Sequence, residues 1–396
     1  MGKAKLVVSD SCMKKLEPIM QKAANFLKKA IDEKTPVRVK FHDDCDGVCS
    51  GIAITLALQT YRKKKGLPEK LECGDNAIES SQAHSAIYLE KNAFEDLKAC
   101  ASFDKKPLFV LLDFGANSES IGALNSLKNA GAKLVVIDHH PPAKEVSKIA
   151  DFFVSSHAHD KTGGHCAGLL ATQTAHFIDK SVAEKYAWYA LQGDKSPLAK
   201  NTEFKEAVAL DYLVHHSEAG TSAEYYAEKL EDEQAIEIAW RLAKRSEQKV
   251  LEHATRHLTV KGCDCDLKFV LVDLEKIVKT GTYPSKGKAI NAVHIMESEK
   301  LEKPVVSFGY TKQSVSVRAN DFATDTGFRA SNVIKQLKKE FERGITSGGG
   351  HDAAASIRFE EDYLKPILIR FQELSCNQLE QHVAKHGPCQ CGGKVC

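Results

Sequence analysis

The chain has 396 residues, enough for two domains, and 43% of them are hydrophobic, so it can build substantial cores. The formal net charge of +2 excludes a protein held to nucleic acid by bulk charge, although a local basic groove remains compatible with it. No apolar stretch reaches the length of a membrane span and the N-terminus lacks a signal-peptide pattern, so we predict a cytoplasmic protein with no membrane partner. The 12 cysteines are expected to be mostly reduced thiols.

The first half of the chain alternates between helix and strand patterns. An amphipathic helix is predicted first, and strands and helices then follow in turn. The predicted strands are 37–42, 108–113, 133–138 and 151–155, and the predicted helices are 10–33, 48–61, 118–130, 166–179, 181–192 and 203–217. This alternation predicts an α/β domain with a doubly wound, mostly parallel sheet.

The second half begins with a charged helical stretch and continues as a smaller α/β unit. Residues 221–258 are interpreted as a connecting helix with a solvated charged face, in preference to a basic nucleic-acid contact. Strands are predicted at 269–272, 304–308 and 314–318 and from 354 onward, with a helix at 328–343. The predicted division is an N-terminal domain at 1–205, a helical connector at 206–260, a second domain at 261–375 and a cysteine-rich tail at 376–396.

Acidic and imidazole side chains follow three of the predicted strands. They are His42, Asp44 and Asp46, then Asp113, then Asp138, His139 and His140. Alternation along the first strand and its extension places His42, Asp44 and Asp46 on one side and Asp43 on the other. In an open parallel sheet, ligands bind beyond the carboxyl ends of the strands.

Carboxylates crowded at such an edge repel one another unless a cation lies among them. The mixture of carboxylate and imidazole suits Mn²⁺, which points to metal-assisted chemistry on a phosphate or similar anion. We predict that one imidazole of the pair His139 and His140 binds metal, that the other binds substrate, and that Asp138 orients them. Asp194, at the end of an apolar helix, is either a routine helix terminus or a further metal ligand.

These residues resemble a known superfamily. Asp44-Cys45-Asp46-Gly47, Asp113, Asp138-His139-His140 and Asp194 are similar, in this order, to the four motifs of the DHH phosphoesterases, over about 35–200. The resemblance implies that Asp46, Asp113, His139 and Asp194 hold one Mn²⁺. It implies that Asp44 and Asp113, with His42, hold a second Mn²⁺. Mg²⁺ is the alternative ion at these sites. The resemblance also assigns His140 to the scissile phosphate. Two histidines in the segment after the fourth strand, His157 and His165, are interpreted as loop histidines.

A second group of residues lies in the C-terminal domain. Gly348, Gly349 and Gly350 let the backbone approach an anion, His351 adds an imidazole donor, and Arg318 offers a bidentate fork for phosphate. A flexible loop is the structural alternative for the glycine run. Together these residues resemble the DHHA1 substrate-binding domain, over about 265–375, which implies that they grip the terminal nucleotide.

The pairing of the two domains resembles RecJ-like single-strand exonucleases, of the compact archaeal GINS- or Hef-associated type. It implies Mn²⁺-dependent hydrolysis of single-stranded DNA or RNA from an end, with release of nucleoside monophosphates in repair or replication, and a GINS or Hef-type protein partner. The alternatives are an oligoribonuclease for short oligonucleotides, a cyclic-dinucleotide phosphodiesterase, and a non-catalytic replication scaffold.

The C-terminal tail carries a separate cluster of thiols. Cys376, Cys389, Cys391 and Cys396 supply four sulfur ligands, the number that a structural Zn²⁺ takes. Their spacing differs from that of a standard zinc ribbon or finger, so a tail with free thiols is the alternative.

Overall fold

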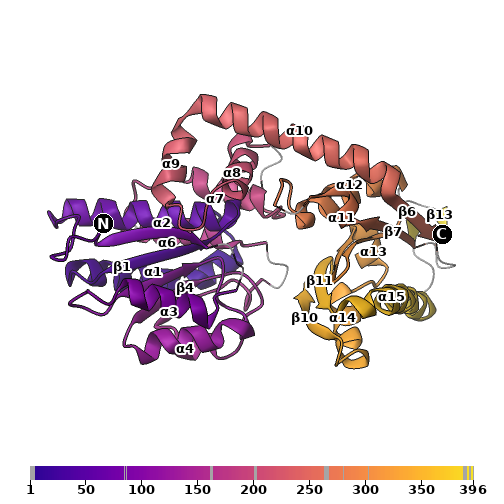
Figure 1. The fold of residues 1–396 in the computed structure, drawn as a ribbon, viewed down its shortest axis with the longest axis horizontal. Coiled ribbons are helices and arrows are strands. Elements are labelled where there is room, and N and C mark those ends of the chain that lie inside the picture. The colour runs from indigo at the N-terminus through magenta and orange to yellow at the C-terminus, as the bar shows by residue number, and fades with distance from the viewer. Residues whose placement is uncertain are drawn as a thin grey trace. The chain divides into compact units, whose positions relative to one another are not determined.

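The computed structural model describes residues 5–83, 85, 87–160, 164–199, 203–262, 267–279, 281–301, 303–386, 390–391 and 394–395. The chain divides into two compact units, Met1–Arg241 and Leu242–Cys396, with the division inside helix α10 (Glu233–His257) (Figure 1). Each unit has its own sheet and its own hydrophobic cores. The predicted fold class, two α/β domains with a parallel sheet in the first, is confirmed. The finer division into four segments stays a prediction.

The first unit is built on a five-stranded sheet in which every strand pair is parallel. The strands are β1 (Val37–His42), β2 (Ile78–Ala83), β3 (Leu108–Leu112), β4 (Lys133–Ile137) and β5 (Phe152–Val154). The helices are α1 (Ser11–Asp32), α2 (Cys45–Lys64), α3 (Glu90–Ala99), α4 (Ile121–Asn129), α5 (Val146–Ile149), α6 (Ala167–Ile178), α7 (Lys185–Gly193), α8 (Lys205–His215) and α9 (Ala223–Glu231).

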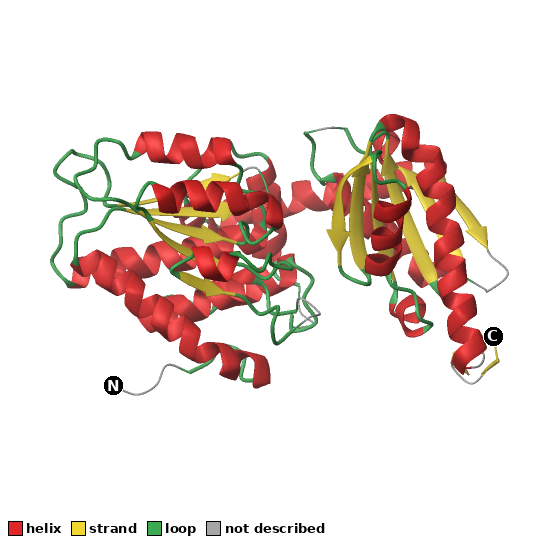
Figure 2. Ribbon diagram, turned by 90° about the horizontal axis from the view of Figure 1, so that it is seen from below, coloured by secondary structure: helices red, strands yellow, loops and turns green. Residues whose placement is uncertain are grey.

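Helices cover both faces of this sheet (Figure 2). One face packs against α1, α2, α6 and α7, and the other packs against α3, α4 and α5. All five residues of β3 are buried, because a parallel strand covered on both faces has no solvent side. Such a strand is a continuous apolar run in sequence, and this explains why β3 and β4 are predicted correctly from sequence.

The strand order β2-β1-β3-β4-β5 determines where a ligand can bind. The chain passes from β1 to β2 on one side and then crosses to β3 on the other side. Connections that diverge in this way leave a crevice at the carboxyl ends of the two strands between which the order reverses. The crevice therefore lies beyond the ends of β1 and β3.

Strand β2 and helix α3 are absent from the sequence prediction. The buried positions of β2 include Ser80 and Gln82, which give the segment little apolar character. Their polar groups are satisfied by α9, since the Ser80 hydroxyl donates to Glu224 and the Tyr226 hydroxyl donates to Gln82. The partners lie 144 residues away, so the local pattern does not reveal the strand.

The second unit is built on a six-stranded mixed sheet in the order β10-β11-β9-β8-β7-β6, in which only the β7–β8 pair is parallel among the described strands. The strands are β6 (Leu258–Gly262), β7 (Lys268–Asp273), β8 (Val305–Thr311), β9 (Ser314–Ala319), β10 (Ile345–Gly350) and β11 (Ala354–Phe359). The helices are α11 (Leu274–Ile277), α12 (Lys286–Leu301), α13 (Asp321–Asp325), α14 (Ala330–Glu340) and α15 (Leu364–His386), and two short strands follow, β12 (Gln390–Cys391) and β13 (Lys394–Val395).

Helix α12 and strand β6 are absent from the sequence prediction, and two predicted features of this unit have a different structure. The glycine run Gly348–Gly350 is the end of strand β10 and not a loop, because its backbone pairs antiparallel with β11. Cys376 lies within α15 and packs against the core of the unit, so the helix continues past the start of the predicted tail. No helix in the described part of the chain is both long enough and apolar enough to cross a membrane.

Candidate metal centre

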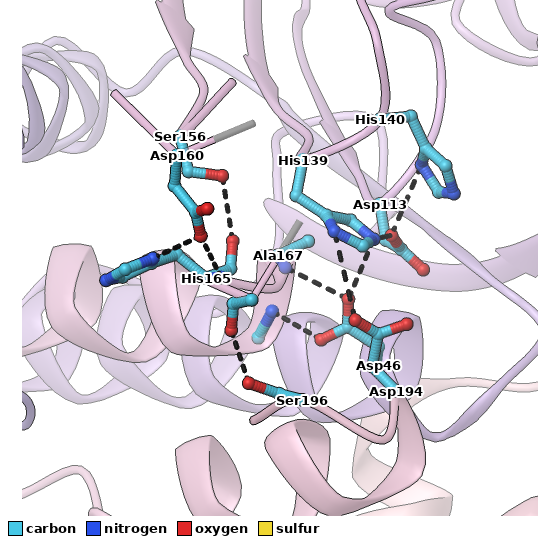
Figure 3. A network of polar contacts seen from close by, with 12 residues as sticks. Asp46, Asp113, His139, His140, Ser156, Asp160, His165, Ala167, Asp194 and Ser196 are labelled. Atoms are coloured by element: carbon cyan, nitrogen blue, oxygen red, sulfur yellow. Dashed lines mark hydrogen bonds and ion pairs between the residues drawn. The ribbon is translucent and has the colours of Figure 1, made fainter. Parts of the chain in front are cut away.

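The predicted acidic clusters meet at the carboxyl edge of the first sheet, and Asp46, Asp113 and His139, one residue from each, lie together (Figure 3). His42 is the last residue of β1, while Asp113 and Asp138 directly follow β3 and β4. These three strands are neighbours in register, and the Asp113 N–H donates to the Ile137 carbonyl at 2.9 Å. The edge coincides with the crevice that the strand order creates.

Asp113 is the centre of this group and is 1% exposed. Its Oδ2 lies 3.3 Å from His42 Nδ1, and its Oδ1 lies 3.4 Å from His139 Nε2 and 3.8 Å from His140 Nδ1. Within the described residues, Asp113 Oδ1 has no hydrogen-bond partner although it is buried. A buried carboxylate oxygen that accepts no hydrogen bond is costly, and a bound cation would remove that cost.

Both ring nitrogens of His42 contact carboxylates. Its Nδ1 lies 3.1 Å from Asp44 Oδ2, and its Nε2 lies 3.2 Å from Asp43 Oδ1. The prediction that Asp43 points away is therefore wrong. Strand β1 ends at His42 and Asp44 already caps α2, accepting a hydrogen bond from the Gly47 N–H at 2.9 Å, so strand alternation does not extend past His42.

Asp46 and Asp194 lie on either side of His139. His139 Nε2 is 3.8 Å from Asp46 Oδ2, and His139 Nδ1 is 3.9 Å from Asp194 Oδ2. Asp46 belongs to the first turn of α2, and Asp194 is the C-cap residue of α7. With Asp113 after β3, side chains from three different elements therefore surround one imidazole.

His140 and Asp138 form a separate pair beside this group. His140 Nδ1 lies 2.8 Å from Asp138 Oδ1, while Asp138 also accepts hydrogen bonds from the Ala116 and His140 N–H groups at 3.0 Å. The side chain of His140 is 44% exposed, whereas that of His139 is 7% exposed. His140 is therefore the more accessible imidazole of the two, and its Nδ1 lies against Asp138.

The electrostatics of the group reflect an excess of buried carboxylates. Burial and the neighbouring charge of Asp113 raise the pKa of Asp46 well above its usual range. Burial raises the pKa of Asp194 to about 7 against the opposing effect of His139. Burial by itself lowers the pKa of His42, but the charges of Asp44 and Asp113 outweigh it and hold the pKa well above its usual value. A divalent cation among these groups would offset the same repulsion.

The donor atoms fit metal ions. Two sets of three residues each bring their ligand atoms within 4.8 Å of one another. One set is Asp113, His139 and His140, and the other is His42, Asp44 and Asp113. Ligands about 2.1 Å from one octahedral ion lie roughly 3–4 Å apart, which matches the contacts above. Both sets contain Asp113. Asp46 and Asp194 belong to neither set and reach the group through His139.

The second unit presents its predicted binding residues on one sheet. Arg318 on β9 pairs with Ala354 of β11, whose neighbour Ala355 pairs with Gly350 of β10. Two strand spacings, or about 10 Å, therefore separate the arginine from the glycine run. Gly350 has a φ of 137°, and a Cβ there would lie 2.5 Å from the Ala354 carbonyl oxygen, so only glycine fits. The His351 N–H donates to the Ala354 carbonyl at 2.7 Å.

The zinc prediction concerns residues that the structure covers only in part. Cys376 is half-buried on α15, whereas Cys389 and Cys396 lie outside the described residues and only the backbone of Cys391 is described. Zinc binding by the tail stays a prediction.

Sequence reasoning missed the groups that hold Asp46. Its carboxylate accepts hydrogen bonds from the Ala167 N–H at 2.9 Å and the Gly168 N–H at 2.6 Å, at the start of α6. The run of small residues at 166–168 was the available signal, since small residues at a helix start leave backbone N–H groups accessible.

Comparisons with known proteins agree with this geometry. Residues 36–193 match the DHH family, N-terminal domain. The chain is 25% identical over 423 aligned residues to uncharacterized protein MJ1198 of Methanocaldococcus jannaschii, covering 94% of this chain and 55% of that protein. The chain thus spans about half the length of the curated relative that it matches.

Solved structures show the same fold. The DHH domain of PF0399, described as a member of a family of ribosomal proteins, has a TM-score of 0.81 at 24% identity and 94% coverage of both chains. RecJ from Thermus thermophilus in complex with Mn²⁺ has a TM-score of 0.59 at 16% identity, covering 91% of this chain and 55% of RecJ. The recognition made from the motifs is confirmed: residues 36–193 match the DHH family, N-terminal domain, and the chain shares the fold of solved DHH-domain and RecJ structures.

Proposed function

We propose that the protein is a two-metal phosphodiesterase that acts as a RecJ-like exonuclease on single-stranded nucleic acid. It hydrolyses the terminal phosphodiester bond and releases nucleoside monophosphates, in DNA repair or replication. The observation that carries the proposal is the buried Asp113 carboxylate, whose two oxygens face two different sets of metal-type donors. A carboxylate in this position can bridge two ions. Bound Mn²⁺ ions would supply charge stabilisation of the phosphoryl oxygens and lower the pKa of an attacking water.

The side chains of the first unit divide into metal ligands and a residue that contacts the phosphate. We assign Asp46, Asp113, His139 and Asp194 to one ion and His42, Asp44 and Asp113 to the other. His140 contacts the scissile phosphate, because its Nδ1 is occupied by Asp138 and its Nε2 is then oriented for a phosphate oxygen. Asp138 orients that ring and favours its charged form, since burial lowers the pKa of His140 but the Asp138 carboxylate raises it by more.

Arg318 and the segment Gly348–His351 are assigned to the terminal nucleotide. Arg318 can form two parallel hydrogen bonds to one phosphate, and the glycine residues of an edge strand expose backbone N–H groups without side chains in the way. Binding of a terminal phosphate by this unit would explain action from an end. The assignment is consistent with the neighbour described as exonuclease RecJ bound to manganese, whose fold this chain shares at a TM-score of 0.57 and 15% identity.

A degradation time course tests the proposal. Single-stranded DNA and RNA, each labelled at the 5′ or the 3′ end, are incubated with the protein and either Mn²⁺, Mg²⁺ or a chelator. We expect mononucleotide products with Mn²⁺, none with chelator, and none with the D113N variant. Dinucleotides and cyclic dinucleotides as parallel substrates separate an exonuclease from an oligoribonuclease or a cyclic-dinucleotide phosphodiesterase. Equal hydrolysis with and without chelator would falsify the metal mechanism.

The protein partner is a second, separate part of the proposal. The resemblance to compact archaeal RecJ-like nucleases suggests a GINS or Hef-type partner. Co-purification of the full chain with each candidate, against the isolated candidate as control, tests it.

A further inference from the structure

The carboxylate of Asp46 is held by the backbone of another helix. Its two oxygens accept hydrogen bonds from the Ala167 and Gly168 N–H groups at the start of α6 (Figure 3). The positive end of a helix dipole favours an ionised carboxylate there. The direction in which Asp46 faces His139 therefore depends on where α6 begins.

Close packing also fixes the start of α6. A Cβ built on Gly168 would lie 2.3 Å from the Ala190 Cβ and 2.8 Å from Asp46 Oδ1. The preceding residues are fastened through their carbonyls, since the Ser156 hydroxyl donates to the His165 carbonyl at 2.9 Å and the Ser196 hydroxyl donates to the Gly164 carbonyl at 2.5 Å. The segment 164–168 is thus hydrogen-bonded both to the loop that precedes it and to the residues that follow α7.

His165 makes the longest-range attachment of this segment. The residue is 7% exposed, and its ring lies between two carboxylates. Nδ1 is 2.6 Å from Asp160 Oδ2, and Nε2 is 2.7 Å from Asp10 Oδ2, across 155 residues of sequence. Asp10 is also the N-cap of α1, where its Oδ1 accepts from the Met13 N–H at 2.9 Å.

We propose that His165 is a positioning residue of the metal centre. By tying segment 164–168 to Asp10, it holds the α6 N–H groups on Asp46 and so sets the affinity of the site that contains Asp46. It touches neither metal nor substrate. The inference rests on the proposed metal function and gives His165 a role beyond that of the loop histidine expected from sequence.

Four variants separate this role from plain destabilisation. His165→Ala removes the tether. Asp10→Ser keeps the N-cap of α1, because a serine hydroxyl caps as well as a carboxylate, but it is too short to reach His165. Asp10→Asn keeps both functions, since its Oδ1 caps α1 and its Nδ2 can donate to a neutral His165 that still donates to Asp160.

The matched control lies at the other end of the same helix. Asp179, the C-cap residue of α6, is buried and accepts hydrogen bonds from Lys64 at 2.5 Å and the Ser181 hydroxyl at 2.7 Å. Asp179→Ala removes a comparable polar network without touching segment 164–168. It should lower the melting temperature and leave Mn²⁺ affinity unchanged.

The readout is the dissociation constant for Mn²⁺, measured by titration calorimetry on the full chain, with the melting temperature measured in parallel. We expect His165→Ala and Asp10→Ser to weaken Mn²⁺ binding about 10- to 100-fold, the range found for groups that orient metal ligands, and Asp10→Asn to stay within about twofold. Nuclease activity of His165→Ala should recover at saturating Mn²⁺.

The outcomes are distinguishable. If the wild-type protein binds no Mn²⁺, the proposed metal function fails and this inference fails with it. If the wild type binds Mn²⁺ and His165→Ala binds it equally well, the tether alone is wrong. If Asp179→Ala weakens binding as much as His165→Ala, the effect belongs to α6 as a whole and the role of His165 is overturned.

Discussion

Asp113 combines an unusual backbone with a central position in the site. Its φ of 64° lies in the left-handed region, which asparagine and aspartate tolerate better than other residues with a Cβ. The left-handed backbone turns the chain directly after β3. Its carboxylate is thereby brought between His42 and His139. The residue therefore has a conformational role and a chemical role, which different substitutions can separate.

Asp113→Asn should abolish metal binding by the carboxylate and keep the left-handed backbone conformation. We expect Mn²⁺ affinity to fall by more than about 100-fold, beyond the range of outer ligand-orienting groups, while the metal-free variant is at least as stable as the metal-free wild type because one buried carboxylate is gone. Asp113→Ala should lose roughly 1 kcal/mol more unfolding free energy, since alanine disfavours the left-handed region. Calorimetric Mn²⁺ titration and urea unfolding measure both. Equal stability of the two variants would contradict the backbone argument.

Substitution of Arg318 should weaken substrate binding and leave Mn²⁺ binding unchanged. Replacing it with alanine removes a charge-assisted bidentate contact worth roughly 1.5–3 kcal/mol, so we expect about a ten- to hundredfold loss of oligonucleotide affinity with unchanged Mn²⁺ affinity. A minimal activated phosphodiester, which lacks a second nucleotide, serves as the control substrate and should be hydrolysed almost normally. An equal loss of activity on both substrates would contradict the assignment of the second unit to the terminal nucleotide.

At the scale of elements, the hairpin of β10 and β11 shows how neighbouring glycines differ in their tolerance. Gly349 has no other atom within 4 Å of a built Cβ. Gly350 has a φ of 137° and a built Cβ only 2.5 Å from both the Ala354 carbonyl oxygen and the Ala355 Cα. The first position therefore accepts a side chain, whereas the second requires glycine.

Gly350→Ala should destabilise the second unit by about 1–3 kcal/mol, the usual cost of a strained backbone position. Gly349→Ala is the matched control and should change stability by less than about 0.5 kcal/mol, as an open surface site does. Urea unfolding followed by circular dichroism measures both variants. A Gly350→Ala protein as stable as the Gly349→Ala protein would mean that the β10–β11 pairing is wrong.

At the scale of the whole molecule, two units with separate cores should respond to metal separately. Every predicted Mn²⁺ ligand lies in the first unit, while Arg318 and the glycine run lie in the second. A ligand that binds only the folded state stabilises the unit that holds it, by about 2.7 kcal/mol at a concentration of 100 times the dissociation constant.

Mn²⁺ should therefore raise the melting temperature of the first unit and leave the second unchanged. Differential scanning calorimetry of the full chain with Mn²⁺ and with chelator measures this, and Arg318→Ala should show the same Mn²⁺ shift as the wild type. A shift of both transitions together would mean that the units unfold cooperatively.

The sequence by itself determined the parts of this protein that local patterns encode. The apolar runs before His42, Asp113 and Asp138 predicted the central strands. Parallel strands must present their carboxyl ends at one edge, so the gathering of these residues followed from the motifs. The order of those motifs also identified the DHH domain, which the family match over residues 36–193 confirms.

Tertiary structure decided the features that depend on distant partners. Strand β2 forms because α9 satisfies its buried polar groups, and Asp46 is oriented by N–H groups more than 100 residues away. The glycine run becomes a strand because β11 pairs with it, and His165 is placed between carboxylates on two segments. A hydrogen bond is determined by which groups packing brings together, and no local pattern of apolar and polar residues carries that information.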